Sequence, residues 1–210
     1  MIRNTARLLS LTAGLMAGAV VLTGCSDNSD SSSAATSAGA SSSINEAAAH
    51  NSADVTFVQE MIPHHQGALA MAQMADGRAE DPRVLDLAAR IEAAQEPEIE
   101  SMTGWLEEWG EPLPEGMGDT SDDMDHGSGG MDMGSMSEGD MAGLDSASGA
   151  QFDRMFLQMM IPHHQGAVDM AETEIGDGSN ADAVQLARDI VASQTAEIAE
   201  MEMLLAELGE

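Results

Sequence analysis

Two copies of the segment Met-Ile-Pro-His-His-Gln-Gly hold most of the side chains in this sequence that could take part in chemistry. One copy runs from Met61 to Gly67 and the other from Met160 to Gly166. Imidazole together with thioether suits Cu(I), and imidazole together with carboxylate suits Cu(II) or zinc, whereas magnesium and calcium prefer oxygen ligands. The two segments therefore predict a metal site, and copper, as Cu(I) or Cu(II), is the expected ion.

The two segments belong to a longer internal repeat, because the sequence matches itself at an offset of 99 positions. The match continues without a gap as far as Gly110 and its counterpart Gly209. Such self-similarity indicates that one structural unit has been duplicated. We assign the two repeats to residues 53–110 and 149–210, within a domain that spans residues 51–210.

Each repeat is predicted to form two helices joined by a turn that contains Gly and Asp. Pro82 is typical of a first helical turn, and Gly110 and Gly209 are typical of positions just beyond a helix C-terminus. No stretch alternates apolar and polar residues over the length of a strand, so an all-α fold is favoured. Two hairpins can bury their apolar stripes against one another as an antiparallel four-helix bundle. The expected helices cover residues 53–75, 82–109, 149–175 and 180–208.

The first helix of each repeat has an inward face, marked by apolar residues at alternating steps of four and three. In the first repeat this face holds His64 between Met61 and Met71. His65 lies about 100° further around the helix, on a flank, so the two histidines are expected to have different roles. The corresponding residues of the second repeat are His163, Met160, Met170 and His164.

The second helix of each repeat carries polar residues on its inward face, Gln95 and Glu98 in the first repeat. Burying an unpaired amide costs about 1–3 kcal/mol, and a carboxylate costs more, so these residues need partners in the core. We predict that His64 and its counterpart are those partners, and that the amides and carboxylates orient the imidazole rings around the metal. The candidate metal-binding residues are His64, His65, His163, His164, Met61, Met71, Met160, Met170, Gln95, Glu98, Gln194 and Glu197.

The segment between the repeats, residues 111–147, is rich in Gly, Asp, Ser and Met and has no helical period, which predicts a long flexible crossover. Linkers do not ordinarily need methionine. The part from Met124 to Met136 is similar to the Met-rich, His-punctuated tracts of bacterial periplasmic copper-resistance proteins, in which flexible thioethers capture Cu(I). An acidic linker without such a role is the alternative. The candidate flexible ligands are Met124, His126, Met131, Met133 and Met136.

The N-terminus has the features of an export signal. Residues 1–24 contain two arginines and then an apolar run of about 15 residues, too short for a comfortable bilayer span. The run ends in Leu-Thr-Gly-Cys25, which resembles the bacterial lipoprotein cleavage box, so Cys25 is expected to carry a lipid. Residues 25–50 have almost nothing to bury and are expected to form a disordered tether. The predicted location is the extracytoplasmic face of the cell membrane, with the lipid anchor as the only membrane contact.

The sequence is strongly acidic, with 37 Asp and Glu residues against 7 arginines and no lysine, and a formal net charge of −30. Nucleic acid and anionic lipid surfaces are therefore poor partners. The negative charge favours cations as partners. The expected partners are a metal ion and, if the metal is passed on, a copper-handling protein.

The doubled Met-Ile-Pro-His-His-Gln-Gly-Ala motif, followed by a helix with Gln and Glu, is similar to the bacterial domain-of-unknown-function 305 family. The resemblance implies a ferritin-like four-helix bundle that is usually exported and often found in metal-handling contexts. Some members are regarded as copper binders, and no reaction is established for the family. The His-His pair of the family corresponds to His64-His65 and to His163-His164. One departure is that Glu60 is replaced by Met159 in the second repeat.

Two other functions fit the same fold. A di-iron or di-manganese oxidoreductase would need about four carboxylates and a Glu-x-x-His spacing on two helices, and that spacing is absent before His64 and His163. An interaction module would use the polar core only to set the register of the helices. Nothing in the sequence resembles a nucleophile with its base, so we expect binding rather than catalysis.

Overall fold

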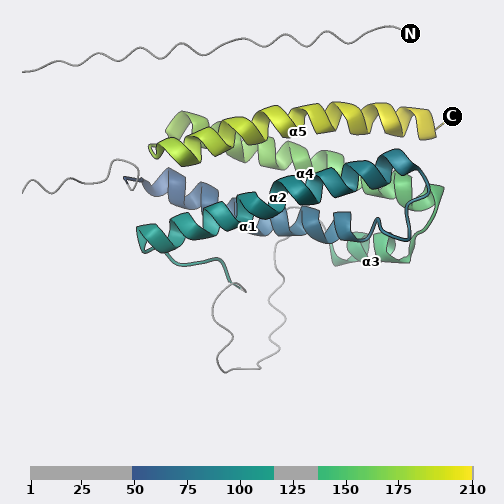
Figure 1. Cartoon of the computed structure of the whole chain (residues 1–210), viewed down its shortest axis with the longest axis horizontal. Helices are drawn as coiled ribbons and strands as arrows, with labels where there is room; N and C mark the ends of the chain where they lie inside the picture. Colours follow the sequence, from purple (N-terminus) through teal and green to yellow (C-terminus); the bar gives the residue numbers. More distant parts are fainter. Residues whose placement is uncertain (1–48, 116–136, 210) are drawn as a thin grey trace, which may run out of the picture. The chain divides into compact units, whose positions relative to one another are not determined.

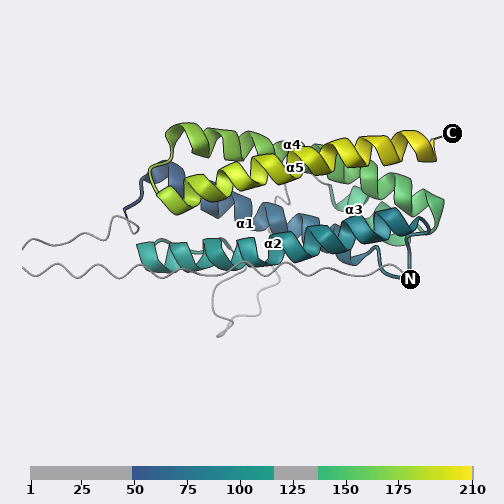
Figure 2. The same ribbon diagram turned by 45° about the horizontal axis from the view of Figure 1, so that its top comes forward.

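The computed structural model describes residues 49–115 and 137–209, and this part of the chain contains five helices and no strand. The helices are α1 (Ser52–Gln73), α2 (Pro82–Trp109), the short α3 (Glu138–Ser146), α4 (Ala150–Asp177) and α5 (Ala181–Leu208). Helices α1 and α2 form one antiparallel hairpin, α4 and α5 form another, and the hairpins pack mainly through α1 and α4 (Figure 1). Figure 2 shows the same four long helices from a second side. The predicted all-α four-helix bundle is confirmed.

Helix α2 begins and ends where the sequence signals predict. The side chain of Asp81 accepts a hydrogen bond from the backbone N–H of Arg83, with Pro82 in the first turn. Gly110 ends the helix with φ 75°, a left-handed conformation that glycine adopts without steric cost. Helix α4 extends to Asp177, two residues beyond its predicted end.

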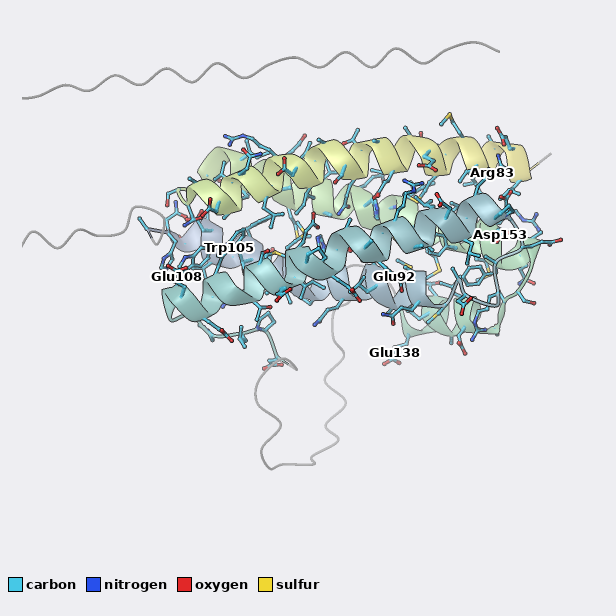
Figure 3. The ribbon with its side chains drawn as sticks, viewed as in Figure 1. Arg83, Glu92, Trp105, Glu108, Glu138 and Asp153 are labelled. Atoms are coloured by element: carbon cyan, nitrogen blue, oxygen red, sulfur yellow. The ribbon has the colours of Figure 1, made fainter. Side chains whose placement is uncertain are left out.

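Two buried aspartates, one from each repeat, join the hairpins at opposite ends of the bundle. Asp54 of α1 accepts hydrogen bonds from the backbone N–H groups of Ser179 and Asn180, at 3.0 and 2.9 Å, in the turn before α5. Its counterpart Asp153 of α4 accepts from Glu80 and Asp81 in the turn before α2, at 3.1 and 2.9 Å. Figure 3 labels Asp153 at the same end of the bundle as Arg83, near the start of α2. This reciprocal capping sets the register of the two hairpins.

A proline lies inside the first helix of each hairpin, Pro63 in α1 and Pro162 in α4. The helices predicted over residues 53–75 and 149–175 continue through these prolines. Proline has no N–H, so each removes one hydrogen bond of the helix and frees the carbonyl four residues earlier. Each proline directly precedes a pair of histidines, so the weakened turn lies next to the candidate site.

The apolar core is divided into two clusters. One joins the C-terminal half of α1 and the N-terminal half of α4, and includes Met71 and Met160. The other joins the N-terminal half of α1 and the C-terminal half of α4, and includes Met61 and Ala167. The polar residues of the repeated motif lie between these clusters along the helices, so the bundle has a polar layer at its centre.

One prediction for the crossover is wrong, because part of it is helical. Helix α3 is capped at its N-terminus by Ser137, whose side chain accepts a hydrogen bond from the N–H of Asp140, while the Asp140 side chain accepts from the N–H of Ser137. Leu144 of α3 is fully buried in the first apolar cluster, and Arg78 bonds Asp145. A capping box and one apolar anchor suffice to order this short helix against the bundle, although its sequence has no periodic apolar face.

Several predicted features lie outside the described residues. These are the signal sequence, the predicted lipid attachment at Cys25, the tether up to residue 48, and the five candidate flexible ligands Met124, His126, Met131, Met133 and Met136. Within the ranges that are described, none of the helices has both the length and the apolar character needed to cross a membrane.

Candidate metal centre

The polar layer at the centre of the bundle contains four histidines, His64 and His65 from α1 and His163 and His164 from α4. We call these four residues the histidine belt. All four are buried, and the exposed fractions of His65 and His164 are both zero. The packing of α1 on α4 thus brings together the two pairs that the sequence places 99 residues apart.

His64 and His163 meet across the boundary between the hairpins. Their ring centroids are 3.7 Å apart, with an angle of 39° between the ring planes. The last glycine of the second motif makes room for this contact, because a Cβ atom at Gly166 would lie only 3.2 Å from Nε2 of His64. The Gly at the end of the motif is therefore explained by close approach of the facing helix to an imidazole.

The nitrogens of this central pair lack partners. Within the described residues, Nδ1 of His64 and both ring nitrogens of His163 have no hydrogen-bond partner of ordinary geometry. Burial, reinforced by the neighbouring histidines, lowers the pKa of His64 to about 4 and that of His163 to about 2. Both rings are therefore neutral near pH 7, and each offers a lone pair, which is the form of histidine that binds a metal.

The outer histidines are each held by a carboxylate from the second helix of their own hairpin. Nε2 of His65 lies 2.7 Å from Oε2 of Glu98, and Nε2 of His164 lies 2.8 Å from Oε2 of Glu197. The Nδ1 atoms of both rings are buried without a partner. An ionised carboxylate can only accept, so Nε2 carries the proton and Nδ1 presents its lone pair.

This pairing corrects the predicted one, in which the carboxylates were assigned to His64 and His163. The separation of about 100° between adjacent helical residues turns His65 toward α2, the partner helix in its own hairpin, while His64 faces the other hairpin. The two histidines of each pair therefore have different surroundings, and the difference in their roles stays a prediction.

The two inward glutamines are also present in the polar layer. Gln95 and Gln194 are each 3% exposed, and the Oε1 atom of each is buried without a hydrogen-bond partner. Their placement in the core agrees with the predicted inward face of α2 and α5. Two further oxygen atoms with unused lone pairs therefore lie in the same layer as the histidines.

The four candidate methionines do not all gather at the belt. Met61 and Met170 belong to one apolar cluster and Met71 and Met160 to the other, so each side of the belt has one pair. Met61, Met71 and Met160 are fully buried. Among the described residues, no group of three or more His, Cys, Asp and Glu side chains is already arranged to hold a metal ion. A bound metal would therefore need thioether or amide ligands beside imidazole, or a rotation of the rings.

One buried acidic residue escaped the sequence analysis. Glu174 of α4 is only 1% exposed, and neither oxygen of its carboxyl group has a hydrogen-bond partner. The corresponding residue of the first repeat is Ala75, which is also buried. Comparison of the two repeats position by position would have revealed this replacement of a small apolar residue by an acid.

This chain is similar to known proteins both in sequence and in structure. A family model described as a domain of unknown function, DUF305, matches residues 54–205. None of the curated proteins searched gives a significant match.

Several solved structures are similar over most of this chain. A DUF305 protein from Streptomyces coelicolor, assigned as secreted, is 34% identical over 75% of this chain and 92% of its own, with a TM-score of 0.64. A DUF305 fragment from Deinococcus radiodurans is 33% identical over 75% of this chain and 97% of the fragment, with a TM-score of 0.62. CopM in its Cu(II)-bound form is 38% identical over 73% and 96%, with a TM-score of 0.60, and has also been solved in Cu(I)-bound, Ag-bound and apo forms. The duplicated four-helix chain described above therefore belongs to the DUF305 family.

Proposed function

We propose that this protein binds copper at the histidine belt and that Cu(I) is the preferred ion. The observation that carries the proposal is the set of five buried histidine nitrogens, contributed by four adjacent rings, that have no hydrogen-bond partner. Leaving buried polar atoms unpaired costs free energy, and proteins rarely do so without a use for them. Each neutral ring has one lone pair, and a metal bound at the belt would use it.

The environment of each ring suits metal binding in a different way. His65 and His164 donate one nitrogen to a carboxylate and leave the other free, the arrangement in which a carboxylate orients a metal-ligating histidine and raises its basicity. His64 and His163 are kept neutral by burial, so a metal there does not have to displace a proton at neutral pH.

The surrounding side chains favour a soft, monovalent ion. Met61 precedes His64 by one helical turn and Met160 precedes His163 in the same way, and both thioethers are fully buried. Imidazole and thioether in an apolar surrounding favour Cu(I) over hard cations. The similarity to CopM, whose structures carry Cu(I), Cu(II) or Ag, supports the same assignment.

The proposal extends to the location of the protein and to the rest of the chain. We assign the protein to the extracytoplasmic face of the membrane, anchored by a lipid on Cys25, and we assign the methionines of the crossover a role in capturing copper before it reaches the belt. The secreted assignment of the Streptomyces relative supports export. In this scheme the protein binds copper and passes it to a copper-handling partner or retains it.

A di-iron or di-manganese site is less well supported. The carboxylates that bond the belt histidines are Glu98 and Glu197, one from each hairpin. Ferritin-like dinuclear sites use about four carboxylates. The donors at the belt are mainly nitrogen, which fits copper better.

The proposal is tested by titrating the full-length protein with Cu(I) in competition with a chromogenic chelator. The belt variant carries His64→Asn and His163→Asn, and the control carries His50→Asn, which changes a histidine that stacks on Trp109 away from the belt. We expect the belt variant to lose at least one equivalent of tightly bound Cu(I) and the control to lose none. Equal copper stoichiometry in all three proteins would show that the belt is not the site.

A second variant separates the belt from the crossover. Replacing the five crossover candidates, Met124, His126, Met131, Met133 and Met136, should remove weaker equivalents and leave the belt equivalent in place. If this variant lost all Cu(I) binding while its far-ultraviolet circular dichroism remained helical, copper binding would belong to the crossover alone.

A further inference from the structure

The two ends of the bundle are related by the internal repeat but are covered differently. At one end, α3 lies against α4 (Figure 1). The side chain of Leu144 in α3 belongs to the first apolar cluster. The residues next to this cluster include Met74, Met155 and Met159. Arg78, in the turn between α1 and α2, bonds the acidic Asp145 of α3. An apolar groove and one basic residue thus hold an acidic helix at this end.

At the opposite end the equivalent groove is open and acidic. A pocket of about 500 Å³ lies between the start of α1 and the end of α4. The counterparts of the apolar and basic residues named above are polar or acidic here: Thr173 for Met74, Thr56 for Met155, Glu60 for Met159, Glu174 for Ala75 and Asp177 for Arg78. These replacements change the groove from one that binds an acidic helix to one that attracts a positively charged group.

Glu174 is the residue of this pocket that points most directly to a ligand. It is 1% exposed, lines the pocket, and has no hydrogen-bond partner on either carboxyl oxygen. The neighbouring Asp54 accepts hydrogen bonds from Asn51, Ser179 and Asn180 and is close enough to Glu174 to interact with its carboxyl group, so two acidic groups share this end of the pocket. In the free protein Glu174 is held protonated beside Asp54, and a cation entering the pocket would let it ionise without leaving a buried charge unpaired.

The shape of the site indicates which kind of cation fits. Within the described residues, no group of three acidic or histidine side chains is close enough to hold a metal ion. The pocket is also within the size range of sites for small organic molecules and much larger than a bare ion needs. The hydroxyl groups of Thr56 and Thr173 add acceptors that a flat guanidinium or a tetrahedral ammonium can use.

We propose that this pocket binds an organic cation, a protonated amine or a guanidinium group, with Glu174 as its buried counter-ion and Glu60 and Asp177 at its rim. The group comes either from a free amine or from a basic side chain of a partner. The chain has no lysine. This site is distinct from the histidine belt and does not depend on copper binding.

A neighbouring glycine supports the view that the carboxyl group of Glu174 has a dedicated position. A Cβ atom at Gly178 would overlap the Glu174 carboxyl group. The absence of a side chain at this position allows the acid to lie against the turn instead of extending into solvent.

The test uses isothermal titration calorimetry on the full-length, metal-free protein. The probes are 1,4-diaminobutane and the amide of N-acetyl-arginine, with calcium chloride as a hard-cation control at equal ionic strength. We expect saturable binding of one equivalent of either organic probe. Glu174→Gln should weaken it at least tenfold, and Glu172→Gln, which removes the same charge from an exposed position of α4, should change it less than twofold.

A second variant tests the pocket without changing the charge. Thr173→Met introduces the residue found at the other end of the bundle, and it should block the pocket and abolish binding while Cu(I) binding at the belt is retained. Tighter binding of the diamine would identify a free amine as the source, and tighter binding of the arginine derivative would identify a partner side chain. Absence of binding by both probes, equal binding by Glu174→Gln, or binding of calcium alone would overturn the proposal.

Discussion

The stability of the metal-free protein is predicted to fall as the pH rises from 6.5 to 8, because of Glu174. Burial, followed by the neighbouring carboxylates of Asp54 and Asp177, raises the pKa of Glu174 from 4.5 to about 8. A carboxyl group whose pKa is raised by folding stabilises the folded state most fully below its unfolded pKa. That contribution is lost progressively as the pH rises toward the folded pKa.

The range from pH 6.5 to 8 separates Glu174 from the other shifted groups. The lowered pKa values of His64 and His163 act mainly below their unfolded value of 6.5. Above it they partly oppose the effect of Glu174, because the unfolded histidines that are still protonated lose their protons as the pH rises. Burial opposes ionisation of Asp54, but hydrogen bonds outweigh it and lower its pKa, so it acts only below 3.8. A group that is protonated only in the folded state lowers the free energy of unfolding by about 1.4 kcal/mol for each pH unit. Because folded Glu174 is already half-ionised near pH 8, its contribution over the whole range is about 1.5 kcal/mol.

The assay is urea unfolding followed by circular dichroism at several pH values between 6.5 and 8. Measured as the difference between the unmodified protein and Glu174→Gln, the free energy of unfolding should fall by about 1.5 kcal/mol across the range. The Glu174→Gln variant should remove this slope, and the exposed control Glu172→Gln should keep it. If Glu174→Gln kept the same slope, or if the unmodified protein showed none, the assignment of a protonated, buried Glu174 would be wrong.

Three further predictions concern the belt and the joints between hairpins. Glu98→Gln should weaken Cu(I) affinity about 10- to 100-fold in chelator competition, because its histidine loses a charged orienting partner; unchanged affinity would remove that histidine from the site. Gly166→Ala should leave the protein about 1 kcal/mol less stable in urea than the matched variant Gly176→Ala, because its methyl group would lie 3.2 Å from Nε2 of His64 and the imidazole would have to shift. The control Gly176→Ala, at a helical position with open space, should not destabilise the protein. Asp153→Ala should cost about 2–3 kcal/mol in the same assay because two backbone N–H groups lose their acceptor, and a cost below about 0.5 kcal/mol would argue against reciprocal capping.

The sequence alone was sufficient to predict the fold and the residues that share a layer. The internal repeat identifies two equivalent hairpins, and local signals such as Pro82 and Gly110 mark helix ends that the structure confirms. Helical periodicity placed His64 on the inward face. These features depend on interactions within a few residues along the chain or on a pattern that recurs every turn, which a sequence displays directly.

Only the tertiary structure decided which side chains meet. Periodicity places Glu98 on an inward face but does not say how far each helix is rotated, and that rotation assigns the carboxylate to His65 instead of His64. Residues 138–146 follow a local capping signal at Ser137, but the helix is held against the bundle by the buried side chain of Leu144, a contact that the sequence does not reveal. The acidic pocket at Glu174 likewise arises where α1 and α4 meet. Rotation, docking and pocket formation are set by the packing of distant segments, so they follow from the assembled bundle rather than from any one helix.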